Sequence, residues 1–276
     1  MSTYLIDGSG YIFRAFYAVA PLTTKGGLHT NALFGFTKML LKLIRDKKGE
    51  KLVVVFDAGR TTFRNELYDK YKANRSEAPQ ELIEQFPYFR KIAKALGLSV
   101  LELPGYEADD VIATLVSKVK DPVIVSGDKD LMQLVGDGTY IIDPMKDKEI
   151  REPEVIEKFG VPPDKVVEVL ALTGDTSDNI PGVKGIGPKT ASDLVLRYGG
   201  ALEILENVQR IENDKNIRSR AKVAKSLREH AEDLKISRVL VEVKRDSPLS
   251  INGRNINELT QNELEEEFSI REPGPE

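Results

Sequence analysis

The sequence predicts an α/β fold in which a mainly parallel central sheet is flanked by helices and followed by a helical region. Short β-rich runs alternate with helical patterns in the first half of the chain, as expected for strand–helix–strand units. Several of these runs are almost continuously apolar, which is typical of strands buried on both faces. After residue 160 the β pattern fades, and a glycine-rich turn separates two helical patterns.

Five strands are expected in the first half, each rich in β-branched or aromatic residues and bounded by turn residues. They are 3–7 (TYLID), 51–57 (KLVVVFD), 98–104 (LSVLELP), 122–128 (PVIVSGD) and 139–143 (TYIID). Helical patterns fall between them, over 31–48, 78–97 and 107–120. The segment 78–97 has a proline near its start and a glycine at its end, which are common helix boundaries.

The second half is expected to be mostly helical. Helical patterns cover 163–174 and 216–240, and 180–200 is expected to hold a helix end, a tight turn and a new helix. The run RVLVEVK (238–244) fits either one more strand or an extended return. The Gly/Pro-rich end REPGPE (271–276) is expected to be a frayed terminus.

Composition excludes several classes of chemistry. The chain of 276 residues is 41% hydrophobic and 30% charged, and it has no run of about 18 apolar residues that would cross a membrane. It has no cysteine, which excludes disulfides, zinc–thiolate sites and cysteine nucleophiles, and it has only two histidines. Because the start also lacks a secretory signal, a cytoplasmic protein is expected.

The net charge of −4 does not indicate nucleic-acid binding, but two local stretches are basic. Residues 59–75 carry five Lys and Arg against two acids, and residues 214–228 carry six against one. Each stretch fits either an electrostatic footprint for a polyanion or a solvated charged face.

Acidic residues follow four of the predicted strands. Three of these strands end in Asp7, Asp57 and Asp128, with Asp130 two residues later. The remaining strand, 98–104, is followed by a helix that opens with Glu107, Asp109 and Asp110. Because the carboxyl ends of parallel strands meet at one edge of a sheet, these acids are expected to gather there. One such acid is often only a helix cap or turn residue, but four such positions together favour a shared ligand.

Clustered carboxylates without histidine or cysteine favour hard divalent cations, so Mg²⁺ or Mn²⁺ is expected. Two such ions about 3.5–4 Å apart can support displacement at a phosphodiester. Bound cations would also relieve the mutual repulsion of the crowded acids.

The segment 172–191 (LTGDTSDNIPGVKGIGPKTA) joins two acids, Asp175 and Asp178, to a glycine-rich turn. The turn leaves backbone N–H groups free at the start of a helix, where a phosphate can bind. With its lysines, this pattern predicts a helix-hairpin-helix that grips a nucleic-acid backbone without reading its sequence. The residues expected to contact DNA there are Gly182, Lys184, Gly185, Gly187 and Lys189.

Five blocks occur in one order from residue 5 to about residue 190: LIDGSGYIFRAFYA, VVVFDAGRTTFRNELYDKYKANR, GYEADDVIATL, VSGDKDLMQLV and LTGDTSDNIPGVKGIGPKTA. Together they resemble the 5′-nuclease (flap endonuclease) superfamily, and most closely the 5′→3′ exonuclease domain at the N-terminus of bacterial DNA polymerase I. The resemblance implies a PIN-like nuclease core over 1–172, with a helical arch at about 60–95. It also implies a helix-hairpin-helix DNA-binding region and a C-terminal tail over 173–276.

The resemblance also implies roles for single residues. Asp7, Asp57, Glu107 and Asp109 would surround one metal ion, and Asp128, Asp130, Asp175 and Asp178 the other, some of them through water. Asp110 would be a nearby acid of the same metal site, and Asp109 and Asp110 are expected to be catalytic. Lys72 and Arg75 match catalytic positions near the scissile phosphate, and Tyr71 and Arg14 match other DNA-contacting positions. Phe13 is placed either to stack on a base or to pack in the core.

The expected activity is that of a metal-dependent, structure-selective 5′→3′ exonuclease or flap endonuclease, which acts on DNA at 5′ ends, flaps and nicks in replication and repair. Two Mg²⁺ or Mn²⁺ ions and a K⁺ ion at the hairpin are implied. The implied partners are DNA, including RNA primers on DNA, and functionally a polymerase and a ligase. A monomer associated with the nucleoid is expected.

Two other functions stay open, namely a ribonuclease with a related acidic core and a non-catalytic DNA-binding protein. The chain is either a stand-alone nuclease or a piece of a longer polymerase.

Overall fold

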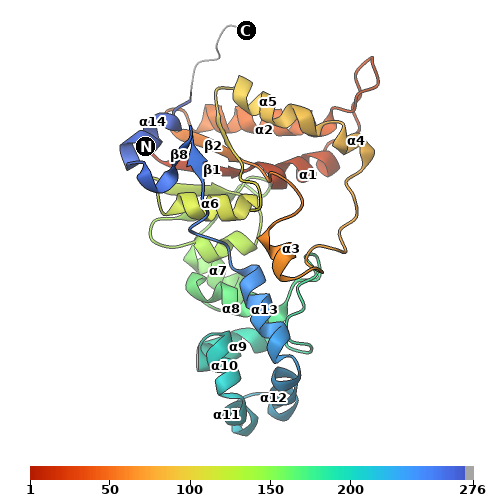
Figure 1. Cartoon of the computed structure of the whole chain (residues 1–276), viewed down its shortest axis with the longest axis vertical. Helices are drawn as coiled ribbons and strands as arrows, with labels where there is room; N and C mark the ends of the chain where they lie inside the picture. Colours follow the sequence, from red (N-terminus) through yellow and green to blue (C-terminus); the bar gives the residue numbers. More distant parts are fainter. Residues whose placement is uncertain (271–276) are drawn as a thin grey trace.

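The computed structural model describes residues 1–270, and a six-stranded sheet forms the centre of its upper part (Figure 1). The strand order is β3-β2-β1-β4-β5-β6, in which β1 to β5 are parallel and β6 is antiparallel to β5. The strands are β1 (Thr3–Asp7), β2 (Lys51–Val55), β3 (Ser99–Leu101), β4 (Pro122–Val125), β5 (Tyr140–Asp143) and β6 (Lys148–Ile150). The predicted α/β class and its five strands are confirmed, whereas the sequence pattern did not predict β6.

The strand order creates a topological switch point between β1 and β4. From β1 the chain adds β2 and β3 on one side, and it then returns to add β4 and β5 on the other. In such sheets ligands bind beyond the carboxyl ends of the strands at this point. The strands predicted over 51–57 and 122–128 stop at Val55 and Val125, so their last residues form loops at this edge.

Side chains alternate along the strands and build a core on each face of the sheet. Leu5 belongs to one core, and its neighbours Tyr4 and Ile6 belong to the other. The core that contains Leu5 continues without a break into the C-terminal helices. Helix α6 (Ala108–Val116) covers this face, and the opposite face is covered by α1 (Gly8–Ala18), α2 (Asn31–Asp46) and α5 (Phe86–Ala95).

The segment predicted as a helical arch, at 60–95, contains short helices joined by loops. It begins with α3 (Phe63–Leu67), which is followed by turns up to residue 74. The single helix predicted over 78–97 is divided into α4 (Gln80–Ile83) and α5. Pro87 lies in the first turn of α5, and its missing N–H prevents one helix from running through both.

The lower part of the molecule is helical (Figure 1). Its helices are α7 (Glu152–Phe159), α8 (Val166–Thr173), α9 (Pro188–Tyr198), α10 (Ala201–Glu206), α11 (Val208–Asn213), α12 (Arg220–Glu229) and α13 (Ala231–Val241). The stretch predicted over 216–240 is therefore divided at His230, where the backbone leaves the helical conformation. The run 238–244 is the end of α13 followed by an extended return, so the strand alternative is wrong.

Short elements complete the chain and hold its end against the sheet. They are the 3-10 helices η1 (Asp130–Leu134), η2 (Pro163–Lys165) and η3 (Ile256–Glu258), the hairpin of β7 (Ser250–Ile251) and β8 (Arg254–Asn255), and α14 (Gln261–Glu267). Glu265 of α14 pairs with the buried amine of Lys51 at 2.8 Å. The frayed end predicted at 271–276 lies outside the described residues. Over residues 1–270, every helix is too short or too polar to cross a membrane.

Candidate functional site

Most of the acids predicted to bind metal line one hollow beyond the carboxyl ends of the central strands. The hollow has a volume of about 330 Å³ and lies at the switch point between β1 and β4. The acids that line it are Asp7, Asp57, Glu107, Asp109, Asp128, Asp130 and Asp178. Asp110 and Asp175 are the two predicted acids that do not line it.

Local hydrogen bonds fix the acids at the strand ends. Asp7 is the N-cap of α1, and its carboxylate accepts from the N–H of Gly10 at 2.8 Å and from the hydroxyl of Ser126 at 2.9 Å. Any side chain at position 10 would overlap this carboxylate, so glycine is required there. Asp57 accepts from the N–H of Ala108 at 2.8 Å. The acids that end β1 and follow β2 thereby cap the helices that begin at the site.

Burial and crowding raise the pKa of three of these acids. Burial, together with the charges of Asp57 and Asp128, raises the pKa of Asp7 to about 6. Burial and the charge of Asp128 raise the pKa of Asp130 to about 6 and hold the pKa of Asp109 well above its ordinary value. A bound cation would relieve this repulsion, which is a physical reason to expect metal here.

Basic and phenolic groups from the predicted arch reach the acids at the rim. Lys72 Nζ lies 2.6 Å from Glu107 and 3.7 Å from Asp178, and Arg75 also pairs with Asp178. The hydroxyl of Tyr71 donates to the other oxygen of Glu107 at 3.1 Å, and the Tyr71 side chain is buried. The predicted catalytic residues Lys72 and Arg75 and the predicted DNA-contacting residue Tyr71 therefore lie in direct contact with predicted metal ligands.

Lys129 is a functional candidate that the sequence analysis missed. Its amine lies 3.2 Å from Asp130 and pairs with Asp175 on the hairpin that follows α8. Burial alone would raise the pKa of the Asp175 carboxyl, but hydrogen bonds from Lys129 and Ser177 hold this pKa at about 2. Lys129 lies between the predicted ligands Asp128 and Asp130 in the block VSGDKD, and this position is the signal that could have identified it.

These ion pairs direct the carboxylates of Glu107, Asp175 and Asp178 toward basic side chains. Within residues 1–270, no three acids are assembled closely enough to ligate a single ion. Glu107, Asp175 and Asp178 are each held by a basic partner, so these three acids could ligate a cation only if those ion pairs opened.

Phe13 and Arg14, both on α1, also line the hollow. Phe13 as a whole residue is 44% exposed, and its ring meets the ring of Phe86 edge-on, with ring centroids 6.3 Å apart. Phe13 is therefore packed on one side only, and its core alternative is wrong. Arg14 lies across Gly127, where any side chain would overlap its guanidinium, and it is 3.9 Å from Asp143.

Asp110 is separated from the other acids. It is fully buried, and its two carboxylate oxygens accept from two nitrogens of Arg64 at 2.7 and 2.8 Å. The same oxygens accept from the backbone N–H groups of Glu107 and Lys244, at 3.0 and 2.8 Å. Both oxygens are thus occupied by donors from the protein, and Asp110 itself does not line the hollow. This corrects the prediction that Asp110 ligates metal or acts in catalysis, because its carboxylate is the partner of a buried arginine.

The hairpin between α8 and α9 begins inside the site and ends outside it. Its first part contributes Asp178 and Ile180 to the hollow. Gly182 is buried with φ +60°, and a side chain there would overlap the backbone of Gly174, so this glycine shapes the turn and is not exposed to a ligand. The other residues predicted to contact DNA are exposed, namely Lys184, Gly185, Gly187 and Lys189.

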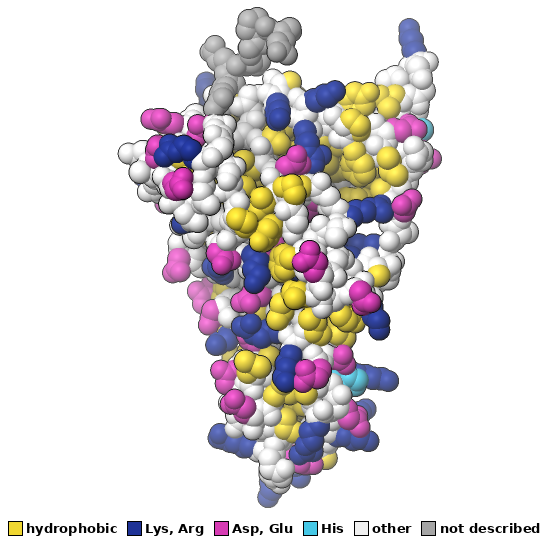
Figure 2. Space-filling model, in the orientation of Figure 1, with side chains coloured by type: hydrophobic (Ala, Val, Ile, Leu, Met, Phe, Trp, Pro, Cys, Tyr) yellow, Lys and Arg dark blue, Asp and Glu magenta, His cyan; other side chains and the backbone are white. Residues whose placement is uncertain are grey.

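The second basic stretch, 214–228, lies on and before α12 at the helical end of the molecule. All six of its lysines and arginines are exposed, and blue side chains are spread over this end in Figure 2. Arg228 pairs with Glu212, and Lys225 lies 3.7 Å from Glu229. The hydroxyl of Ser226 on α12 donates to the carbonyl of Lys184, so this helix lies against the hairpin.

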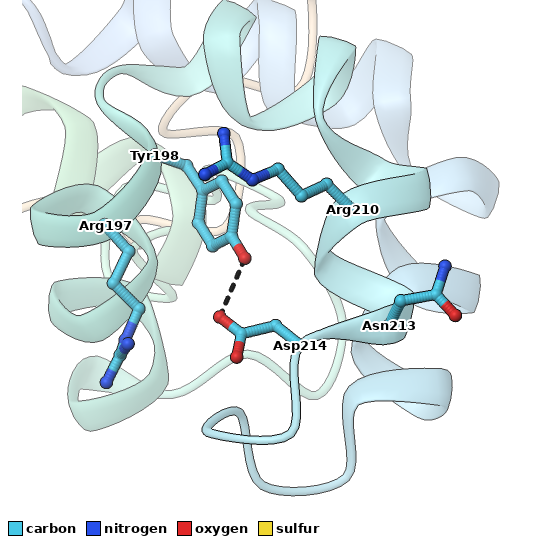
Figure 3. A pocket seen from close by; sticks show the side chains of 5 residues that line it. All are labelled: Arg197, Tyr198, Arg210, Asn213 and Asp214. Atoms are coloured by element: carbon cyan, nitrogen blue, oxygen red, sulfur yellow. Dashed lines mark hydrogen bonds between the residues drawn. The ribbon is translucent and has the colours of Figure 1, made fainter.

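A second hollow, of about 480 Å³, lies between α9 and α11, away from the acids (Figure 3). The hydroxyl of Tyr198 donates to Asp214 at 2.8 Å, and Arg210 stacks over the Tyr198 ring. Arg197 points away from this ring and pairs with Asp193. A single acid, already paired, gives this hollow no means of holding divalent cations, so the acid-lined hollow is the candidate functional site.

Comparisons with known proteins identify the family of this chain. The family model described as 5′-3′ exonuclease, N-terminal resolvase-like domain, matches residues 2–160. The model described as 5′-3′ exonuclease, C-terminal SAM fold, matches residues 161–266. The 5′-3′ exonuclease of Aquifex aeolicus is 42% identical over 92% of this chain and 85% of its own length. The DNA polymerase I of Rhizobium leguminosarum is 45% identical over 90% of this chain, which spans only 25% of that polymerase.

A solved structure shares the fold. The flap endonuclease D15 of bacteriophage T5, in a pseudo-enzyme-product complex with DNA and metal ions, is 25% identical and gives a TM-score of 0.69 over 87% of this chain and 89% of that chain. The predicted resemblance is therefore confirmed. Two domain models that together match residues 2–266 show that this chain is a nuclease of the 5′-3′ exonuclease family.

Proposed function

We propose that the chain is a divalent-metal-dependent, structure-selective 5′→3′ exonuclease and flap endonuclease that hydrolyses DNA phosphodiesters at 5′ ends, flaps and nicks. One observation carries this proposal, namely that seven acids from four strand ends and the hairpin line a single hollow with basic residues at its rim. The donors are carboxylate oxygens without sulfur or imidazole, a set that fits Mg²⁺ or Mn²⁺. Two such ions would polarise the scissile phosphate and activate the attacking water.

The residues of the chain would position the substrate. The turns at 68–75 lie against the hairpin, since the N–H of Lys72 donates to the carbonyl of Asp178 at 2.8 Å and Asn179 Nδ2 donates to the carbonyl of Lys70 at 2.7 Å. Lys72 and Arg75 are thereby held at the rim, where they would exchange their carboxylate partners for the phosphate beside the cut. The proposal therefore makes these two residues catalytic.

Other residues would hold the DNA on either side of the cut. Phe13 has an open face on which a base can stack, and Arg14 is held at the same wall of the hollow. On the hairpin, Lys184 and Lys189 would contact duplex phosphates without regard to sequence. The K⁺ expected at the hairpin stays a prediction, as do the ligase and polymerase that would work beside this enzyme.

A cleavage assay tests the proposal. End-labelled flap DNA, nicked duplex and a single-stranded RNA of the same sequence would be incubated with the protein in Mg²⁺ or in chelator. We expect short 5′ products from the flap and the nick in Mg²⁺ alone. Preferred cleavage of the RNA would support the ribonuclease alternative, whereas tight flap binding without cleavage in either Mg²⁺ or Mn²⁺ would support a non-catalytic DNA-binding protein.

A further inference from the structure

Arg64 is an arginine buried at the base of the proposed arch. The whole residue is 2% exposed, although it belongs to a short helix that leads into surface turns. Its guanidinium donates to both oxygens of Asp110, at 2.7 and 2.8 Å. It also donates to the backbone carbonyls of Leu240 and Glu242, at 2.9 and 3.0 Å. One side chain thus connects three parts of the chain that lie far apart in sequence.

Asp110 carries these contacts to the acids of the site. It is the third residue of α6, and its side chain accepts from the N–H of Glu107, the N-cap of that helix, at 3.0 Å. The backbone of Glu107 is therefore tied to a buried carboxylate, while its own carboxylate contacts Lys72 and Tyr71. Asp109 lies between these two anchored residues.

The extended return after α13 completes the connection. Asp110 accepts from the N–H of Lys244 at 2.8 Å, and the neighbouring carbonyls of Leu240 and Glu242 accept from Arg64. Helix α13 packs against α8, which leads directly into the hairpin. The buried pair therefore joins the helical region to the helix that carries two predicted metal ligands.

We propose that Arg64 is a positioning residue for the nuclease reaction, which acts through Asp110 to fix the start of α6 and hence the carboxylates of Glu107 and Asp109. The proposal rests on the proposed function, because it needs those carboxylates to hold the catalytic cations. Arg64 and Asp110 form a buried ion pair, and Arg64, which lines the hollow, also lies 3.7 Å from the carboxylate of Glu107. Arg64 therefore positions Glu107 in two ways, through the backbone tie that Asp110 makes and through its own ion pair with the Glu107 carboxylate.

The test separates positioning from stability. Removal of one partner of a buried ion pair leaves an uncompensated charge, whereas replacement of both by apolar groups of similar size is often neutral for folding. The informative variant is therefore the double substitution Arg64→Met/Asp110→Leu, compared with Arg64→Met alone. Melting temperature, affinity for a flap DNA in Ca²⁺, and the single-turnover cleavage rate at saturating DNA would be measured across a Mg²⁺ series.

We expect the double variant to melt close to wild type and to bind the flap with similar affinity. Its saturated rate should fall by about 100-fold, the usual cost of a misplaced catalytic group, and its half-saturating Mg²⁺ concentration should rise. A double variant that melts and cleaves like wild type would overturn the proposal, as would a loss confined to DNA affinity. A wild-type protein without Mg²⁺-dependent cleavage would instead refute the proposed function.

A matched control exists in the helical region. Arg238 on α13 pairs with the buried carboxylate of Glu168 at 3.0 Å, outside the acid-lined hollow. Arg238→Met should lower the melting temperature and leave the saturated rate unchanged. If the double variant does not fold, Arg64→Ala assayed with added methylguanidinium replaces it. Recovery of the cleavage rate at a lower Mg²⁺ midpoint would support positioning, and recovery of the melting temperature without the rate would overturn it.

Discussion

Replacement of Asp7 by asparagine should stabilise the protein in chelator while it stops cleavage. In the structure Asp7 is buried, with 7% of the residue exposed, and its carboxylate is repelled by Asp57 and Asp128. Two hydrogen bonds, from Gly10 and Ser126, offset this repulsion only in part. Asparagine has nearly the same shape and no charge, so it removes the repulsion and keeps an acceptor for one of the two donors.

The magnitude follows from the pKa of Asp7, which burial and repulsion raise from 3.8 to about 6. A shift of roughly two units corresponds to about 3 kcal/mol against the ionised form at neutral pH. Loss of one hydrogen bond costs about 1 kcal/mol. Because the neighbouring acids titrate together with Asp7, the net gain should be about 1–2 kcal/mol, which is a rise in melting temperature of roughly 2–6 °C.

The gain should depend on pH with a defined sign. Since folding raises the pKa of Asp7, its carboxyl contributes stability that is fully present below about pH 4 and is lost as the pH rises through about 6. The advantage of Asp7→Asn should therefore be largest near neutral pH and disappear toward about pH 4. Added Mg²⁺ should stabilise the wild type and narrow the difference.

Melting curves in chelator and in Mg²⁺, over a pH series, would measure these effects. Asp164→Asn is the matched control, because this exposed acid lies outside the hollow and should leave both stability and cleavage unchanged. If Asp7→Asn melted below wild type in chelator at neutral pH, its two hydrogen bonds would outweigh the repulsion, and the physical reason given for metal binding would fail at this acid.

Three further results are expected. Asp109→Ala should remove cleavage while flap binding survives, and turnover near wild type in Mg²⁺ would contradict its role as a ligand. Lys72→Ala and Arg75→Ala should each lower the single-turnover rate by roughly 10²-fold at saturating DNA, and a loss of affinity alone would make them ordinary backbone contacts. Lys184→Ala/Lys189→Ala should weaken flap binding and flatten the plot of log affinity against log salt by about 0.9 per lost contact, with the saturated rate nearly intact. An unchanged slope would make the hairpin lysines structural.

The sequence predicted the buried strands well because continuous apolar runs are stable only when they are buried in the core. It failed where tertiary contacts decide. The short edge strand β6 carries Lys148 and Glu149, both exposed, and so gives no apolar signal. Helix α1 was also not predicted, because it opens with Gly8 and Gly10, which are poor helix formers. The cap from Asp7 compensates for them, and the space for that cap exists only because position 10 has no side chain.

The site was predictable to the extent that strand ends determine it. Asp7, Asp57 and Asp128 lie at the carboxyl ends of the neighbouring parallel strands β1, β2 and β4. The order of these strands in the sheet is enough to bring the three acids together. The basic partners were less visible. Lys129 reaches Asp175 only because the loop after β4 and the hairpin after α8 lie next to each other, and local sequence does not encode that approach.

Asp109 and Asp110 show where a motif stops carrying information. Successive residues on a helix point about 100° apart, so one of two adjacent acids can face a crevice while the next faces the core. The sequence pattern of α6 does not show which of the two acids faces the crevice and which faces the core, since both precede the same apolar run. The choice is made by Arg64, 46 residues earlier in the chain, whose guanidinium occupies both oxygens of Asp110 and leaves Asp109 at the hollow. An acid within a conspicuous cluster can be assigned to a metal only after the cation that already neutralises it has been located.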